Sequence, residues 1–199
     1  MTVYDQARQL EACLPAFLAA KYEPGYQVVV VDESSTDDTD DVLKLLKQSH
    51  PQLYTTFLPR PYRNVTRRKL ALSIGIKASK NDWVIMTGID KTPDTSDWLE
   101  ELAGTIDSTT EAVAGYFLKK GLRLQTFEDI GQCRQLVTKA ERKMRNSRNS
   151  RFMKYRLGRY DFIAVRRDLA FDLLQYFEQN LGAARLFRLR WSVLLSNLF

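Results

Sequence analysis

Acidic residues follow two apolar segments of the chain. Asp32 and Glu33 come directly after the segment 27–31 (QVVVV), and Asp90 comes shortly after the segment 82–87 (DWVIMT). An ionised carboxylate only accepts hydrogen bonds, so the first pair could bind the N–H of a base and the hydroxyls of a ribose. Asp90 could bind Mg²⁺ or Mn²⁺, hard ions that take oxygen ligands and bridge them to a diphosphate. Asp32 could instead cap the helix that follows its strand.

Strands and helices alternate in the pattern that must position these residues. The pattern predicts strands over 27–31, 53–58, 82–87 and 111–119, and helices over 6–20, around 42–46, and over 67–79 and 95–106. The β-branched run 28–31 is typical of a strand buried on both faces, as in parallel sheets. We therefore expect an α/β fold with an open, mostly parallel sheet and helices on both faces. Such sheets bind ligands at the carboxyl ends of their strands.

Beyond this point the alternation weakens. We expect a long basic helix over 127–156, a strand over 160–165 and a helix over 167–181. No linker divides the chain, so a single domain over 1–199 is expected.

The order of these features resembles that of family 2 glycosyltransferases with the GT-A fold, across about residues 1–105 and more thinly beyond. The matching strings are VYDQARQLEACLPAFLAAKYEPGYQVVVVDESSTDDTDDVL, RRKLALSIGIKASKNDWVIMTGIDKTPDTSDWLEEL and, loosely, YDFIAVRRDLAF. The resemblance implies a nucleotide-sugar site at the strand ends and at the start of helix 67–79. Its residues would be Tyr4, Asp5, Asp32, Glu33, Arg68, Lys69 and Asp90.

By this resemblance, each group has an expected role. Asp32 and Glu33 would meet uracil or guanine and the ribose, and Asp90 would be the last position of a D-x-D motif that binds Mg²⁺ or Mn²⁺. Residues 1–106 would form the nucleotide-sugar-binding half, and 107–199 an incomplete acceptor-side half. The implied activity is transfer of a sugar from a UDP- or GDP-linked donor to a glycan or lipid-linked acceptor.

Departures from the family pattern favour an alternative. Only three residues precede Tyr4, where the family has a full apolar strand, so we expect that central strand to be missing or badly shortened and its neighbours to have unpaired edges. Gly88 replaces the first carboxylate of D-x-D. The alternative is a catalytically impaired or truncated domain that binds nucleotide weakly or not at all.

No general base is identified in the sequence, although an inverting transferase needs one to deprotonate its acceptor. Asp161, Asp168, Asp172 and Glu178 are available in the C-terminal half. Asp168 is typical of a helix cap, and Asp172 and Glu178 are typical of a helix surface.

Charge and cysteine content limit the possible binding partners and the cellular location. The net charge is +6, and the tail 184–199 mixes arginines with apolar residues, which predicts peripheral contact with an anionic membrane or burial against the sheet or a partner. Nucleic acid is not expected, because the acidic loop 32–41 would repel phosphate. Cys13 and Cys133 form no CxxC pair, and no signal-peptide pattern is present. We expect a cytoplasmic protein, with the inner face of the membrane as a further location.

Overall fold

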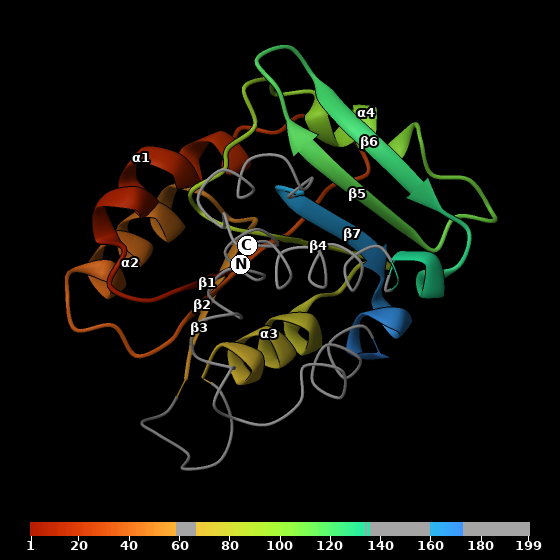
Figure 1. The fold of residues 1–199 in the computed structure, drawn as a ribbon. Helices are drawn as coiled ribbons and strands as arrows, with labels where there is room; N and C mark the ends of the chain where they lie inside the picture. The colour runs from red at the N-terminus through yellow and green to blue at the C-terminus, as the bar shows by residue number, and fades with distance from the viewer. Residues whose placement is uncertain (59–66, 134, 136–159, 173–199) are drawn as a thin grey trace, which may run out of the picture.

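The computed structural model describes residues 1–58, 67–133, 135 and 160–172 (Figure 1). The N-terminal part contains a parallel sheet of order β1-β2-β3. Its elements are β1 (Thr2–Val3), α1 (Ala7–Leu18), β2 (Val28–Asp32), α2 (Thr39–Ser49) and β3 (Leu53–Phe57). The β-branched run of β2 lies between two helical layers, which is why it contains no polar residue before Asp32.

The second sheet is antiparallel, with the order β4-β7-β5-β6. Its part of the chain contains α3 (Arg67–Ala78), β4 (Trp83–Thr87), α4 (Trp98–Ala103), β5 (Ala112–Phe117), β6 (Leu122–Phe127) and β7 (Phe162–Arg166). The predicted α/β fold is confirmed, whereas the expected parallel pairing is found in the first sheet only. A short turn joins β5 to β6, with Gly121 at a φ of 82°, and a turn of this length can join only antiparallel strands.

Helices cover both faces, as expected. Figure 1 shows α1 and α2 together on one side of β1–β3 and α3 on the other. A single apolar cluster joins α1, α2 and α4 to both sheets; it includes Leu14, Val30, Trp98 and Phe162. Phe162 is fully buried against the rings of Trp98 and Phe117, so this cluster holds the two sheets together.

Several predicted boundaries differ from the observed ones. Helix α1 (Ala7–Leu18) is slightly shorter than the predicted 6–20 and contains Pro15, and α4 (Trp98–Ala103) is shorter than the predicted 95–106. Strand β6 was not predicted at all, since the helix was expected from residue 127. Residues 130–133 and 167–172 are helical. The structure therefore describes the first turn or turns of the helices predicted over 127–156 and 167–181. The remainder of both, and the tail 184–199, lie outside the described residues. Within the described ranges, no helix is both long enough and apolar enough to cross a bilayer.

Candidate functional site

The parallel sheet brings the first four predicted residues to one edge. Val3 pairs with Asp32, and the Glu33 N–H donates to the Val3 carbonyl oxygen at 2.8 Å. Tyr4 and Asp5, which follow β1, therefore lie beside Asp32 and Glu33, which end and follow β2. This is the carboxyl edge of the strands, where ligands bind in open α/β sheets.

Asp32 closes the first turn of the loop after β2. Its Oδ1 accepts hydrogen bonds from the Ser35 N–H at 3.0 Å and the Ser35 hydroxyl at 2.5 Å. The residue is only 9% exposed, and Glu33 beside it is 8% exposed. Asp32 therefore closes a turn of the loop and does not cap α2, whose N-cap residue is Asp38. A carboxylate has two oxygens, and the bonds to Ser35 use only Oδ1 of Asp32, so the carboxylate can accept further hydrogen bonds.

Asp5 ties the loop after β1 to the loop after β2. Its Oδ1 accepts from the Thr36 N–H at 2.6 Å, and its own N–H donates to Ser35 Oγ at 2.9 Å. Asp5 has a φ of 48° and Ser34 a φ of 66°. Non-glycine residues seldom adopt this left-handed conformation, and such residues cluster at functional sites. The two loops thus form one hydrogen-bonded unit, and Tyr4 of the first loop is exposed.

Much of the remaining acidic loop has a structural role. The Ala7 N–H donates to Asp37 Oδ2 at 3.1 Å, and the Gln6 N–H donates to Thr39 Oγ1 at 3.2 Å. These bonds satisfy N–H groups at the start of α1. The Thr39 hydroxyl and nearby N–H groups lower the pKa of Asp37. We therefore do not count Asp37 among candidate ligand residues.

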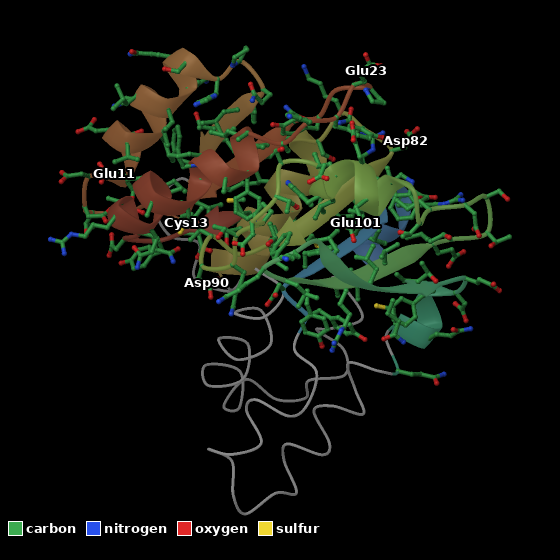
Figure 2. The ribbon with its side chains drawn as sticks, turned by 90° about the horizontal axis from the view of Figure 1, so that it is seen from above. Glu11, Cys13, Glu23, Asp82, Asp90 and Glu101 are labelled. Atoms are coloured by element: carbon green, nitrogen blue, oxygen red, sulfur yellow. The ribbon has the colours of Figure 1, made fainter. Side chains whose placement is uncertain are left out.

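The end of β4 places Asp90 at the surface. Thr87 and Ile89 are buried, whereas Asp90 is exposed. Figure 2 shows Asp82 and Asp90 on opposite sides of the molecule, as expected for residues before and after β4. Asp90 therefore lies beyond the carboxyl end of β4.

Asp161 lies at this same edge. The next residue, Phe162, pairs with Thr87 at the end of β4, and Thr87 Oγ1 donates to the Asp161 carbonyl oxygen at 3.2 Å. Asp161 Oδ2 accepts from the Phe117 N–H at 3.0 Å. Burial raises the pKa of the Asp161 carboxyl, and the negative charge of Asp90 raises it further.

The sequence analysis did not single out Asp161 from its neighbours, because only strand pairing brings it to β4. Asp168, by contrast, accepts the Leu169 N–H on Oδ1 at 3.0 Å, and Asp172 is exposed. Glu178 lies outside the described residues. Asp161 is thus the candidate base that the described structure brings close to Asp90.

An aromatic pair borders Asp161 and was also missed. The rings of Tyr116 and Tyr160 are 5.2 Å apart, and the Tyr160 hydroxyl donates to Gln125 Oε1 at 2.5 Å. Burial raises the pKa of Tyr160 to about 12, so this phenol stays protonated at neutral pH. The alternation of apolar and polar residues over 122–125, which includes Gln125, was a strand signal in the sequence.

Arg68 and Lys69 belong to the first turn of α3, and their side chains lie outside the described positions. Helix α3 ends at Ala78, shortly before β4 starts, so its first turn lies at the opposite edge, the carboxyl one. Their expected proximity to base and phosphates stays a prediction.

The described residues include no group of three or more His, Cys, Asp or Glu side chains that could hold a metal ion. Asp90 offers one carboxylate, and Gly88 offers none. Magnesium often keeps several waters and binds one or two carboxylates together with substrate phosphates. The donor set at Asp90 therefore fits a cation held mainly by a diphosphate and water.

Comparison with known proteins gives the family. The chain resembles the mannosyltransferase PcManGT from Pyrobaculum calidifontis, solved in complex with GDP-Man and Mn²⁺, with a TM-score of 0.57 and 20% identity over 86% of this chain and 44% of that one. It also resembles S. aureus TarS 1-349, with a TM-score of 0.54 and 17% identity over 93% of this chain and 51% of that one. The chain thus spans about half the length of these structures, and the likeness shows the GT-A fold. No curated protein matches the chain.

The family profile described as Glycosyl transferase family 2 matches residues 1–170. This match covers most of the 199 residues, including both strand ends at the candidate site. The chain belongs to glycosyl transferase family 2.

Proposed function

We propose that this domain binds a UDP- or GDP-linked sugar at the carboxyl edge of its strands and transfers the sugar to a glycan or lipid-linked acceptor. The observation that carries the proposal is that the pairing of β7 with β4 brings Asp161 near Asp90 at the carboxyl end of β4, and that Asp32 stands at the carboxyl end of β2. A likeness to a GDP-Man complex and membership of the family support the same ligand class.

The nucleoside would lie over the unit formed by the two loops. Asp32 has acceptor capacity beyond its bonds to Ser35, which suits the N–H of a base or a ribose hydroxyl. Tyr4 is 45% exposed beside it, so its ring is accessible to a planar base. Arg68 and Lys69, in the first turn of α3, would supply positive charge to the diphosphate.

The diphosphate would lie toward Asp90, with Mg²⁺ or Mn²⁺ bound to that carboxylate. When bound, such an ion would neutralise the charge that develops on the departing nucleotide. The Mn²⁺ in the mannosyltransferase complex supports this choice of ion. We further propose Asp161 as the group that takes the proton of the acceptor hydroxyl, because its raised pKa brings it closer to neutral pH than an ordinary aspartate.

A second candidate is a domain that has lost transfer activity and binds nucleotide weakly. Gly88 favours it, because one carboxylate of the metal motif is absent. Asp32 and Asp5 both accept hydrogen bonds within the loops, and this favours the second candidate too. Each carboxylate has a structural role that requires no bound nucleotide. This candidate predicts little or no dependence of nucleotide affinity on metal.

Calorimetric titration separates the two candidates. UDP, GDP and their sugar conjugates would be titrated in Mn²⁺ and again in EDTA, with the Asp90→Asn variant as a matched control. Transfer activity predicts that one nucleotide binds in Mn²⁺ and loses affinity in EDTA, and that the variant shows no such loss. Absence of binding in both conditions would support the inactive domain.

Membrane contact and cytoplasmic location stay proposals. The tail 184–199, on which the expected contact with anionic lipid depends, lies outside the described residues. Co-sedimentation with vesicles containing phosphatidylserine, compared with neutral vesicles, would test the contact. Salt-insensitive or absent sedimentation would contradict an electrostatic attachment.

A further inference from the structure

Two tyrosine rings lie side by side next to Asp161. Tyr116 belongs to β5, and Tyr160 comes directly before Asp161 in the chain. The two ring centroids are 5.2 Å apart, and the ring planes are inclined by 33°. Both residues are half-buried, so part of each side chain remains accessible. We call Tyr116 and Tyr160 the tyrosine pair.

The tyrosine pair lies where one face of the second sheet changes from apolar to polar. Toward the interior, this face carries Ala114 and Ile163, which belong to the apolar cluster that includes residues of α3. Because side chains alternate along a strand, Tyr116 lies on the same face as Ala114. Their partners on β6, Arg123 and Gln125, lie on this face too and are exposed. This end of the face is therefore polar and accessible.

The order of the strands places Asp161 between the proposed donor site and the tyrosine pair. The order is β4-β7-β5-β6, and β7 pairs antiparallel with both β4 and β5. The carboxyl ends of β4 and β5 and the amino end of β7 therefore lie at one edge. Asp90 follows β4, Asp161 precedes β7, and Tyr116 lies near the end of β5. An acceptor on the tyrosine pair would thus meet Asp161 from the side away from Asp90.

Hydrogen-bonding groups around the tyrosine pair lack partners among the described residues. The Tyr160 hydroxyl uses Gln125 Oε1, and the Gln125 amide nitrogen has no partner in this part of the chain. The Tyr116 hydroxyl and the Arg123 guanidinium likewise form no hydrogen bond or ion pair within it. Burial raises the pKa of Tyr116, the charge of Asp161 raises it further, and Arg123 lowers it. The Tyr116 phenol therefore stays protonated at neutral pH and can donate a hydrogen bond.

We propose that the tyrosine pair binds the sugar ring that carries the accepting hydroxyl. This inference rests on the proposed function, because it takes Asp161 as the base. A sugar ring has C–H groups that stack on aromatic rings, and hydroxyls that need hydrogen-bond partners. The rings of Tyr116 and Tyr160 would contact the C–H groups. Gln125 and Arg123 would bind hydroxyls of the same ring.

The surroundings favour a neutral sugar over a sugar-free lipid phosphate as the acceptor. A phosphate on the tyrosine pair would lie beside the Asp161 carboxylate, and two negative charges repel each other. A prenyl chain would need an apolar groove, whereas Arg123 and Gln125 are polar and exposed. A free glycan and a lipid-linked sugar present the same ring, so both fit this chemistry.

Binding of simple glycosides to protein with carbon-13-labelled tyrosine tests the proposal. The probes are methyl glycosides of glucose, mannose, galactose and N-acetylglucosamine, with farnesyl phosphate as a sugar-free lipid phosphate, each with and without nucleotide. We expect at least one glycoside to receive saturation transfer from the protein and to shift the ring signals of Tyr116 and Tyr160. The ring signal of Tyr54, which belongs to β3 in the other sheet, should not move. Tyrosine-to-phenylalanine variants assign these signals.

Substitution separates the aromatic ring from its hydroxyl. Tyr116→Leu removes the ring and should weaken glycoside binding by about 2- to 10-fold. Tyr116→Phe keeps the ring and should weaken binding less. Tyr54→Leu is the matched control, because Tyr54 is exposed on a strand of the other sheet, and it should leave binding unchanged. Equal weakening by Tyr54→Leu would contradict the assignment to the tyrosine pair.

Titration of nucleotide in Mn²⁺ keeps this proposal distinct from the proposed function. Nucleotide binding without any glycoside contact would overturn the acceptor site and leave the donor site standing. Glycoside contact without nucleotide binding would support the acceptor site and contradict the donor site. Ring shifts with farnesyl phosphate alone would overturn the choice of a sugar. Octyl glycosides distinguish the two sources of sugar: tighter binding than the methyl glycosides supports a lipid-linked sugar, and equal binding supports a free glycan.

Discussion

Substitution can separate two roles of Asp32: closing the loop after β2, and binding a nucleotide. Asp32→Ala removes both hydrogen bonds to Ser35, and loss of a hydrogen bond of this kind costs about 0.5–1.5 kcal/mol of stability. Asp32→Asn keeps a carbonyl oxygen that can accept the Ser35 N–H, so its cost in stability should be smaller. Both variants remove the charged acceptor.

The expected loss of nucleotide affinity follows from that charge. A hydrogen bond to a charged group contributes about 1.5–3 kcal/mol, and each 1.4 kcal/mol is roughly tenfold in affinity. Asp32→Asn should therefore weaken nucleotide binding by about 10- to 150-fold, measured by calorimetry. Urea unfolding of the same variants measures how much each substitution lowers the free energy of unfolding.

Ser35→Ala is the matched control. It removes the Ser35 hydroxyl bond to Asp32 at 2.5 Å and the bond from the Asp5 N–H to Ser35 Oγ at 2.9 Å, and it leaves the Asp32 carboxylate in place. We expect it to lower the free energy of unfolding while changing nucleotide affinity by less than about threefold. If Ser35→Ala weakens nucleotide binding as much as Asp32→Asn does, the Asp32 carboxylate affects binding by holding the loop in place and not by contacting the nucleotide. If neither substitution at Asp32 changes affinity, its assignment to the nucleotide is refuted.

Four further outcomes follow from the structure. Asp90→Asn should reduce nucleotide affinity in Mn²⁺ to its value in EDTA; calorimetry that still shows enhancement by Mn²⁺ would remove Asp90 from the metal site. Asp161→Asn should lower sugar transfer by about 10²–10⁴-fold without weakening nucleotide binding, and wild-type turnover should rise with pH through the raised pKa of this carboxyl, because a base must be ionised. Full turnover in that variant would exclude Asp161 as the base. Gly115→Ala would direct a Cβ into the ring of Phe162, which is fully buried, so denaturant unfolding should show a loss of about 1–3 kcal/mol; an unchanged midpoint would mean that the ring moves aside freely. Asp107 has a pKa lowered to about 2 by neighbouring threonine hydroxyls, so its contribution to stability is present above the ordinary value of 3.8 and is lost as pH falls toward 2. The stability difference between wild type and Asp107→Ala should shrink over that range, and a difference independent of pH would contradict the assignment.

The local sequence pattern was sufficient to predict β2 and α3. The apolar run predicted over 27–31 is observed as Val28–Asp32, and the helix predicted over 67–79 as Arg67–Ala78. These segments carry their own signals, since a β-branched run between two helical patterns has few alternatives. The acidic residues at the end of β2 follow from the same local reading.

Strand β6 was missed although its signal was present. Residues 122–125 alternate between apolar and polar side chains after a Lys-Lys-Gly turn. The basic stretch that follows suggested an earlier helix start, so the alternation was assigned no strand. The antiparallel direction of the second sheet was likewise beyond local pattern, because a strand does not encode the direction of its neighbour.

The sequence by itself determined the α/β class and the strand ends that carry Asp32 and Asp90, since each depends on residues close together in the chain. Tertiary structure decided which strands pair, and thereby that Asp161 lies near Asp90 although 70 residues separate them in the numbering. It also decided that Ser35 occupies one oxygen of Asp32 and that residues of β2 and β4 line one cavity. These features arise from packing between distant segments, where the free energy depends on how whole surfaces fit and on which backbone groups find partners.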